Sequence, residues 1–389
     1  MGFPFAYRAK SRKGRGLFRK APDPREIGDR FGRLLKRMQG SAVLRAAWKG
    51  ERYLAELEIS PLVPAISLVV GDDAELTITG DATFGPAVIA DVAARMAPIF
   101  EELDFVWVDE APSIETAQAM VCAKLRETLQ KSDGRVRIGV PARKFLIDAP
   151  VLTALGPRDA AWRDGVSAEP SRARDAFPYW EPGPGRAALA RALVAMWLEI
   201  PWREPLDREE RDLFKQVDED LRAARKAKLD VPWRAWQELL RHMGVEDEDV
   251  DEKAKDATDP PIGYRRHDLE AELSGGWSVR MSGAMIGHWE DDGARYWATD
   301  GDRVLEFTSL TAEEERDTDK LLAVAPEAHP VIARFAEGEQ RGRAEAFEDD
   351  GVAVVVGLMA RAPHVGILTC KGGERDWALA TWRSLQHKD

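Results

Sequence analysis

The sequence predicts an α+β protein built from several modules, and three features of the chain support this. Apolar residues recur with a helical period in some segments and alternate with polar residues in others, as in half-buried strands. Residues 246–261 hold eight carboxylates and end in Pro260-Pro261, which separates a helical region from a last mixed region. The chain has 389 residues, enough for two or three hydrophobic cores. We therefore expect an N-terminal α+β domain, a central helical module and a C-terminal α+β domain.

The first domain is predicted over residues 21–148. Helical periodicity begins at Arg25, again after Pro86, and again after Ser113, which is placed to cap the third helix together with Thr116. Alternation predicts strands at residues 54–59, 67–70, 75–79, 105–108 and 136–140. The order is helix, three strands, helix, strand, helix, strand, which favours a sheet with helices on one face.

Residues 149–245 are rich in proline and tryptophan and are predicted to form a helical module. One helix follows Gly185 and ends before Pro201, another begins after Asp207 as an N-cap, and a last one follows Pro232. The tryptophans are candidates either for a stacking platform for sugars or bases or for core packing, and their helical spacing favours the core. Residues 246–261 bury too little apolar surface to offset their ordering entropy, so we expect an acidic, solvated linker.

The last domain is predicted over residues 262–389. The expected strands and helices, in order, are strands 277–281, 284–289, 295–298 and 303–308, helix 311–322, strands 343–347, 353–358 and 365–369, and helix 374–385. The aspartates at 291–292 and at 300 and 302 stand beside glycines and are interpreted as tight turns of an antiparallel meander. They lack the spacing and the closing glutamate of a calcium-binding EF-hand loop.

A resemblance to a known family comes from the ends of this domain. Gly276-Trp277 opens it, and it closes with residues 364–369 (His-Val-Gly-Ile-Leu-Thr), Trp377-Ala378-Leu379 and Trp382-Arg383-Ser384-Leu385. Residues 262–387, about a third of the chain, resemble the Mog1/PsbP/DcrB-like superfamily. The resemblance implies an antiparallel-sheet α/β/α sandwich that binds a partner and has no catalytic role, since members of that group serve as binding modules, lipoproteins and chaperones. The chain departs from the lipoprotein branch because it has no N-terminal cysteine for lipid attachment.

Composition and charge limit the classes of function. The chain is 44% apolar and 32% charged, as in soluble globular proteins, and no run of about eighteen apolar residues predicts a membrane span. Cys122 and Cys370 fit no metal or redox spacing, which favours a cytoplasmic protein with two buried thiols over one with a disulfide between them. The net charge is −12, although residues 1–20 hold seven basic residues and no acidic one.

The basic N-terminus is predicted to be a disordered tail over residues 1–20. It would either contact a phosphate-rich or acidic partner or serve only as a solubilising terminus, and the second alternative is favoured. Because the rest of the chain is acidic, we expect nucleic acid to bind only through this tail, if at all. The candidate contact residues are Arg8, Lys10, Arg12, Lys13 and Arg15.

No motif in the chain predicts catalysis. The six histidines form no zinc-binding HxxxH or HExxH pattern, and the nucleophile elbow, the P-loop and the dinucleotide fingerprint are missing from the sequence. We therefore predict no catalytic residue, no metal and no cofactor. An enzyme whose site is assembled from scattered residues, for example around His267 or His288, is a second hypothesis. A nucleic-acid-associated regulator that uses the basic tail is a third.

The favoured hypothesis is a non-enzymatic protein-interaction module, such as an immunity protein, adaptor or chaperone of a bacterial toxin, secretion or defence system, whose acidic surface suits a basic partner. The candidate partner-binding residues are Trp289, Tyr296 and Trp297. Tyr296 and Trp297 are neighbours on a predicted strand, so their side chains point to opposite faces. We expect at least one of the two rings to be outward, where it either anchors a partner or packs on the helical module.

Overall fold

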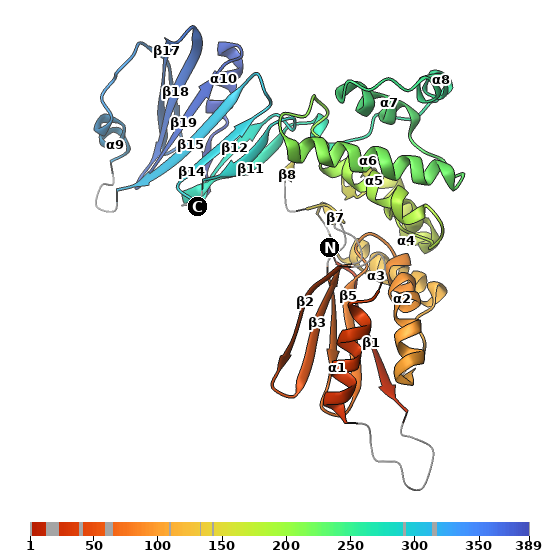
Figure 1. Ribbon diagram of the computed structural model, residues 1–389. Helices are drawn as coiled ribbons and strands as arrows, with labels where there is room; N and C mark the ends of the chain where they lie inside the picture. The colour runs from red at the N-terminus through yellow and green to blue at the C-terminus, as the bar shows by residue number, and fades with distance from the viewer. Residues whose placement is uncertain are drawn as a thin grey trace.

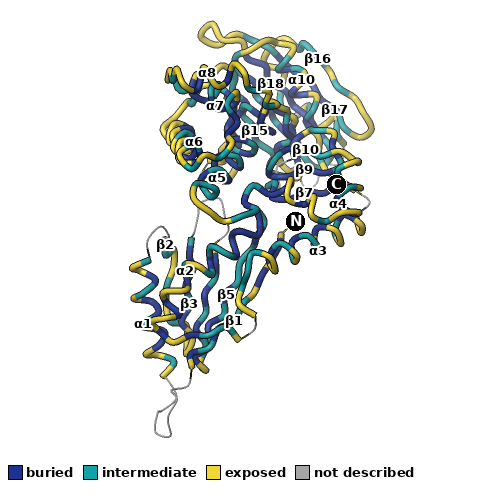
Figure 2. The backbone as a smooth tube through the Cα atoms, turned by 90° about the vertical axis from the view of Figure 1, so that its right-hand side faces the viewer, coloured by how far each residue is buried: buried dark blue, intermediate teal, exposed yellow. Residues whose placement is uncertain are grey.

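The structure, a computed structural model, confirms a mixed α+β fold of several modules (Figure 1). It describes residues 2–12, 23–38, 42–58, 65–108, 110–132, 134–141, 144–290, 293–312 and 317–388. The N-terminal sheet, the helices α5 and α6, and the C-terminal sheet follow one another in space as they do in the chain. Many of the buried residues belong to the strands of the N-terminal and C-terminal sheets, whereas one side of α6 is exposed along its length (Figure 2). In the described part of the chain, no helix combines the length and the apolar character needed to cross a membrane.

The N-terminal domain is built on a six-stranded antiparallel sheet in the order β2-β3-β4-β5-β1-β6. The helices α1, α2 and α3 share one hydrophobic core with this sheet. The N-cap of α3 forms as its sequence predicts, because Ser113 and Thr116 bond each other's backbone N–H in a capping box. The bounds are β1 Pro4–Ser11, α1 Pro24–Leu35, β2 Ala42–Lys49, β3 Arg52–Glu58, β4 Ile66–Val70, β5 Glu75–Asp81, α2 Ala87–Leu103, β6 Phe105–Trp107 and α3 Ile114–Lys131.

Strand β1 (Pro4–Ser11) corrects, for its own residues, the prediction of a disordered tail over residues 1–20, of which residues 1 and 13–20 lie outside the described part of the chain. It lies between β5 and β6 and pairs antiparallel with both. Phe3, Phe5 and Ala9 are at most 6% exposed and belong to the core of the domain. The physical reason is that Phe3, Phe5 and Ala9 lie on one face of the strand, while Pro4, Ala6 and Arg8, which lie between them, are exposed on the other, so the segment has one apolar face for a sheet to bury.

The first domain is longer than the predicted residues 21–148. Strands β7 (Val136–Ile138) and β9 (Val151–Thr153) pair in parallel, and β10 (Gly156–Arg158) continues this small sheet. The helix α4 (Ala160–Ala168) and the 3₁₀ helix Pro170–Ala176 follow. Their buried residues pack into the first core, which therefore extends past the predicted boundary; they are Val166, Ala173 and Ala176, followed by Phe177 and Tyr179.

One short strand leaves this domain altogether. β8 (Lys144–Phe145) pairs with β11 (Leu269–Glu272), in the C-terminal part of the chain. Phe145 is fully buried, and its ring stacks on Tyr264 at 5.1 Å between centroids. The predicted domain boundary therefore runs through a segment that two domains share.

The helical module consists of α5 (Arg186–Leu198), α6 (Arg208–Lys226), α7 (Trp233–His242) and α8 (Glu248–Asp256). Asp207 caps α6 as predicted, since its side chain accepts a hydrogen bond from the Glu210 N–H at 2.8 Å. Trp236 is fully buried, and its indole N–H donates to Asp218. The preference for core packing over a stacking platform is confirmed for this tryptophan and for Trp202, which is 9% exposed.

Helix α8 corrects the prediction of a solvated linker over residues 246–261. Asp247 accepts a hydrogen bond from the Val250 N–H, and acidic residues fill the first turn of the helix, where its dipole favours them. Val250 and Ala254, four residues apart, are buried against the other helices. Arg222 forms an ion pair with Asp247 at 3.0 Å. The acidic segment is therefore ordered because its few apolar residues share one helical face.

The C-terminal domain combines a seven-stranded antiparallel sheet, in the order β13-β14-β15-β19-β18-β17-β16, with a four-stranded one, β20-β12-β11-β8. Helix α9 begins at Thr318, where the sequence predicts a helix from residue 311, because β15 extends to Thr311. The remaining bounds are β12 Trp277–Met281, β13 Ile286–Trp289, β14 Arg295–Thr299, β15 Val304–Thr311, α9 Thr318–Val324, β16 Val331–Glu337, β17 Gln340–Asp349, β18 Val352–Arg361, β19 His364–Lys371, α10 Arg375–Arg383 and β20 Gln386–His387.

The two helices of this domain lie on opposite faces of the seven-stranded sheet. Trp382 of α10 shares a core cluster with Met359, whereas Leu321 of α9 packs with Ala360. Met359 and Ala360 are neighbours on β18, so their side chains point to opposite faces. Helices therefore cover parts of both faces, as the α/β/α arrangement predicts.

Candidate partner-binding surface

Strand β13 forms one edge of the seven-stranded sheet. Among the described residues it pairs with a single strand, β14, in an unbroken register from Ile286 opposite Thr299 to Trp289 opposite Tyr296. In an antiparallel ladder only every second residue directs its N–H and C=O toward the partner strand. The other residues of β13 direct theirs away from β14, and the strand is exposed from Gly287 to Trp289. It therefore offers backbone donors and acceptors to another extended chain.

The structure brings the three predicted aromatic residues together on β13 and β14. Trp289 is 42% exposed, and its ring lies 5.1 Å from that of Tyr296, which is 8% exposed. Trp297 points to the opposite face, is 36% exposed, and stacks on His288 of the adjacent strand. The outward ring of the neighbouring pair is therefore Trp297. Its ring contact is with its own sheet, which does not favour the alternative of packing on the helical module.

A pocket of about 280 Å³ adjoins β13 on the side of Trp289 and Tyr296. Met281, Met285 and Leu269 supply apolar lining, and the pocket lies between β13 and β11. Methionine side chains adapt to the shape of what they contact, which suits a site for a partner side chain. The sequence gives no local signal of this pocket, because β11 and β13 are brought together only by the fold.

Charged residues at the rim of the pocket compensate one another. Lys144 and Lys388 each lie 3.1 Å from the same oxygen of Glu270, and Lys388 is also 3.3 Å from Glu272. Burial raises the pKa of Glu270, but the hydrogen bonds from Lys388 and Lys144 outweigh it and hold the pKa below its ordinary value. Glu270 is therefore ionised at neutral pH and is poorly suited to act as a general acid.

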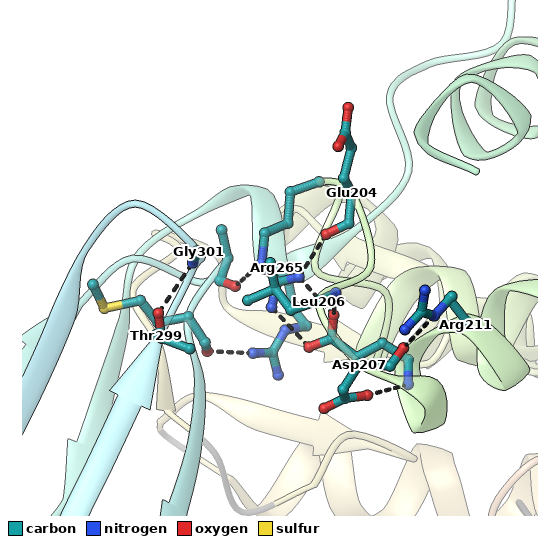
Figure 3. Close-up of polar contacts among 11 residues, drawn as sticks. Glu204, Leu206, Asp207, Arg211, Arg265, Thr299 and Gly301 are labelled. Atoms are coloured by element: carbon teal, nitrogen blue, oxygen red, sulfur yellow. Dashed lines mark hydrogen bonds and ion pairs between the residues drawn. The ribbon is translucent and has the colours of Figure 1, made fainter. Parts of the chain in front are cut away.

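Two arginines from outside the sheet fix the start of β13, and sequence reasoning does not find them. Arg203 donates to the Ala284 carbonyl at 3.0 Å, and both Glu210 oxygens accept from its guanidinium at 2.6 and 2.7 Å. Arg265, which is 4% exposed, donates to the Met285 carbonyl at 2.7 Å. These contacts lie where the loop before α6 meets the C-terminal domain (Figure 3). A bidentate, buried arginine–carboxylate pair has a rigid geometry. These contacts therefore hold the N-terminal end of β13 in one position.

Two of the basic candidates of the N-terminus, Arg8 and Lys10, lie on a different sheet from these aromatic residues (Figure 1). Arg8 and Lys10 are on β1 and form ion pairs with Glu75 at 3.7 Å and Asp73 at 3.5 Å. Arg12 follows the strand, and its N–H donates to the Asp104 carbonyl. Lys13 and Arg15 lie outside the described residues. The structure therefore places two of these five residues on a paired strand and a third directly after it.

The histidines and cysteines form no chemical centre in the part of the chain that the structure describes. No group of three or more potential metal ligands lies together there, and neither His267 nor His288 forms an ion pair with a carboxylate. Both cysteines are free; Cys370 is 1% exposed, and burial raises its pKa to about 12. Cys122 is only half-buried, and burial raises its pKa as well. Neither thiol is activated as a nucleophile.

No protein-family model matches this chain, and no curated protein is significantly similar to it in sequence. The resemblance of residues 262–387 to the Mog1/PsbP/DcrB-like superfamily therefore stays a prediction. The function has to be argued from the geometry of β13 and its surroundings.

Proposed function

We propose that this protein is a non-catalytic protein-binding module whose C-terminal domain receives an extended segment of a partner along β13. The observation that carries the proposal is that β13 is an edge strand with an exposed tryptophan beside an apolar pocket. Strand addition is a common mode of peptide recognition, in which backbone hydrogen bonds supply affinity and side-chain pockets supply specificity.

The alternation of strands defines what the partner segment presents. A strand added next to β13 would direct every second side chain toward the face of Trp289 and Tyr296, and thus toward the pocket. The side chains between them would lie on the face of His288 and Trp297. We therefore expect the partner segment to have a large apolar residue at the position that faces the pocket. The residues before and after it would face Trp297 and should be able to pack against an aromatic ring.

Aromatic side chains at this edge fit the role of anchors. A tryptophan buries a large area at a small cost in side-chain entropy, and residues of this type carry much of the energy in protein interfaces. Both Trp289 and Trp297 retain more than a third of their surface for such burial. Because they lie on opposite faces, a single added strand can contact both.

The overall charge suggests the class of partner. The chain has a net charge of −12, so its field favours the approach of a basic protein. Roles as an immunity protein, adaptor or chaperone of a bacterial toxin, secretion or defence system are consistent with this mode of binding. A role of Glu270 as a general acid receives less support because its pKa is lowered, and nucleic-acid binding receives less support because Arg8 and Lys10 are already paired with carboxylates.

Selection of a phage-displayed library of random peptides against the full-length protein tests the proposal. We expect enriched peptides to bind the Trp289→Ala variant about 30-fold more weakly, a loss of ~2 kcal/mol. Leu310→Ala is the matched control: Leu310 is 59% exposed on β15 of the same sheet, and its loss should leave peptide affinity unchanged. Hydrogen exchange should also slow at the backbone of β13 when peptide binds.

Two results would contradict the proposal. One is a selection in which no peptide prefers the wild-type protein over Trp289→Ala. The other is a set of peptides that bind while the amides of β13 exchange as fast as before. Either result would place the binding surface elsewhere.

A further inference from the structure

A second pocket, of about 590 Å³, lies between α10, the end of β12 and the turn that precedes β15. Three arginines line it, and each comes from a different element: Arg280 from β12, Arg303 from the β14–β15 turn and Arg383 from the last turn of α10. Ser282 and Thr381 also line this pocket, as does one carboxylate, that of Asp268, which is paired with Arg280. Three cationic side chains around one cavity are notable on a chain whose net charge is −12.

Carboxylates of the protein use only part of the hydrogen-bonding capacity of these arginines. Arg280 donates to Asp268 through Nε at 2.8 Å, and Arg303 donates to Asp300 through Nε at 2.9 Å and Nη2 at 2.5 Å. Within the described residues, both Nη groups of Arg280, Nη1 of Arg303 and the whole guanidinium of Arg383 have no carboxylate or carbonyl acceptor. An arginine carries five N–H donors in a planar fork, so several donors remain available to a ligand.

Arg303 is held in place for such a role. Its guanidinium lies over the ring of Trp377 at 5.0 Å from the centroid, and its side chain is 29% exposed. The same tryptophan lines the pocket with Ala380 and Met281, which gives the cavity an apolar wall beside its cationic groups. A guanidinium fixed by an ion pair and a ring loses little freedom when it binds an anion.

We propose that this pocket binds a small organic phosphate, with the phosphoryl group held by Arg280, Arg303 and Arg383 and the organic part against Trp377. Donors that arrive from three elements match a tetrahedral oxyanion better than a planar carboxylate, which offers only two oxygens. The carboxyl end of α10 lines the pocket, and a helix C-terminus by itself disfavours an anion. The last carbonyls of α10 already accept hydrogen bonds from the N–H groups of Ser384 and Leu385, which reduces this unfavourable effect.

This proposal is independent of the peptide site on β13. The two pockets have Met281 in common, but the arginines contribute to the second one alone. Loss of one binding activity should therefore leave the other intact.

Calorimetric titration of the full-length protein with phenyl phosphate, benzoate and phenol tests the ligand chemistry. We expect phenyl phosphate to bind most tightly, benzoate more weakly and phenol not at all, with an affinity for phenyl phosphate that falls as salt is added. Arg383→Gln should weaken phenyl phosphate at least about tenfold, because charge-assisted hydrogen bonds are lost. Arg383 is exposed and unpaired among the described residues, so this variant should fold normally.

Arg375→Gln is the matched control, since Arg375 is an exposed arginine on the first turn of the same helix and does not line this pocket. It should leave the affinity for phenyl phosphate within about twofold of wild type, because a distant surface charge is screened by salt. Equal weakening by Arg375→Gln and Arg383→Gln would overturn the proposal, as would benzoate that binds as tightly as phenyl phosphate, or no detectable binding of phenyl phosphate at low salt.

Discussion

The two edges of the seven-stranded sheet, β13 and β16, are built differently. β16 has a bulge between Val331 and Ala333 and places Arg334 and Glu337 in solvent. Bulges and charged side chains are the devices by which proteins keep sheet edges from pairing with other chains. β13 has a regular register and an exposed Trp289. The comparison indicates that one edge carries devices against association, whereas the other lacks them.

The N-terminal sheet follows the pattern of β16. Its edge strand β2 has a bulge between Val43 and Arg45 and exposes Arg45 and Lys49. Two long edges in different domains thus carry the same protection, which makes the absence of a bulge and of a charged side chain on β13 informative.

The edges also differ in the ion pairs beside them. Next to β16, Arg343 and Glu345 of β17 form a pair at 2.9 Å with side chains only 6% and 5% exposed. Glu345 also accepts from the N–H groups of Ala328 and His329, which hold the segment before β16. Next to β13, the Glu290–Arg295 pair at 3.4 Å is 50% and 56% exposed. The protected edge is therefore stabilised by a buried ion pair, whereas the pair at the C-terminal end of β13 is solvated.

The largest expected effect is on stability, at the protected edge. Glu345→Ala leaves the buried Arg343 without its carboxylate and frees two backbone N–H groups, which should lower the free energy of unfolding by about 3–5 kcal/mol. Urea unfolding followed by tryptophan fluorescence measures this. Glu337→Ala, an exposed acid on β16 itself, is the control and should change stability by less than about 0.5 kcal/mol.

The same variant has a defined pH dependence. Burial raises the pKa of Glu345, but hydrogen bonds from Arg343 and from the N–H groups of His329 and Ala328 outweigh it, so the pKa lies below its ordinary value. A lowered pKa stabilises the folded state above the unfolded-state value of about 4.3, and the contribution is lost as the pH falls through the folded-state pKa. Wild type and Glu345→Ala should therefore converge in stability in acid. A difference that persists or grows there would show that the charge of Glu345 is not what stabilises this edge.

The next effect is on binding, at the open edge. Trp297→Ala should weaken peptides selected on the wild-type protein by about 2 kcal/mol if the ring is an anchor. The melting temperature should stay close to that of wild type, because Trp297 is 36% exposed. Surface plasmon resonance and thermal melting give the two readings, with Val352→Ala, 43% exposed at the start of β18, as control. Lost stability with unchanged affinity would assign the ring to the fold and remove it from the binding surface.

The smallest effect is expected at the ion pair beside β13. Glu290→Ala should lower the free energy of unfolding by less than about 0.5 kcal/mol, because both partners are solvated and the pair is screened by salt. Urea unfolding at low and at high salt compares this variant with wild type. If Glu290→Ala lowered the free energy of unfolding as much as Glu345→Ala, the two ion pairs would stabilise their edges equally. The proposed difference between the two edges would then be wrong.

The sequence by itself determines the elements whose signals are local. Ser113 with Thr116 and Asp207 with Glu210 begin helices where predicted, since a capping side chain and the N–H it accepts from lie within one turn. Strand alternation likewise places Tyr296 and Trp297 on opposite faces without knowledge of the fold. The α+β class follows from these local periods, and so does the choice of aromatic candidates.

Only the tertiary structure determines what lies beside each element. β1 enters the sheet between β5 and β6, and β8 joins β11, by pairings that depend on hydrogen bonds between segments far apart in the chain. The start of β13 is held by Arg203, 81 residues away from the carbonyl to which it donates. The periodicity and the capping residues of the sequence do not predict this contact. An arginine guanidinium can donate to any carbonyl that the packing of other residues places near it.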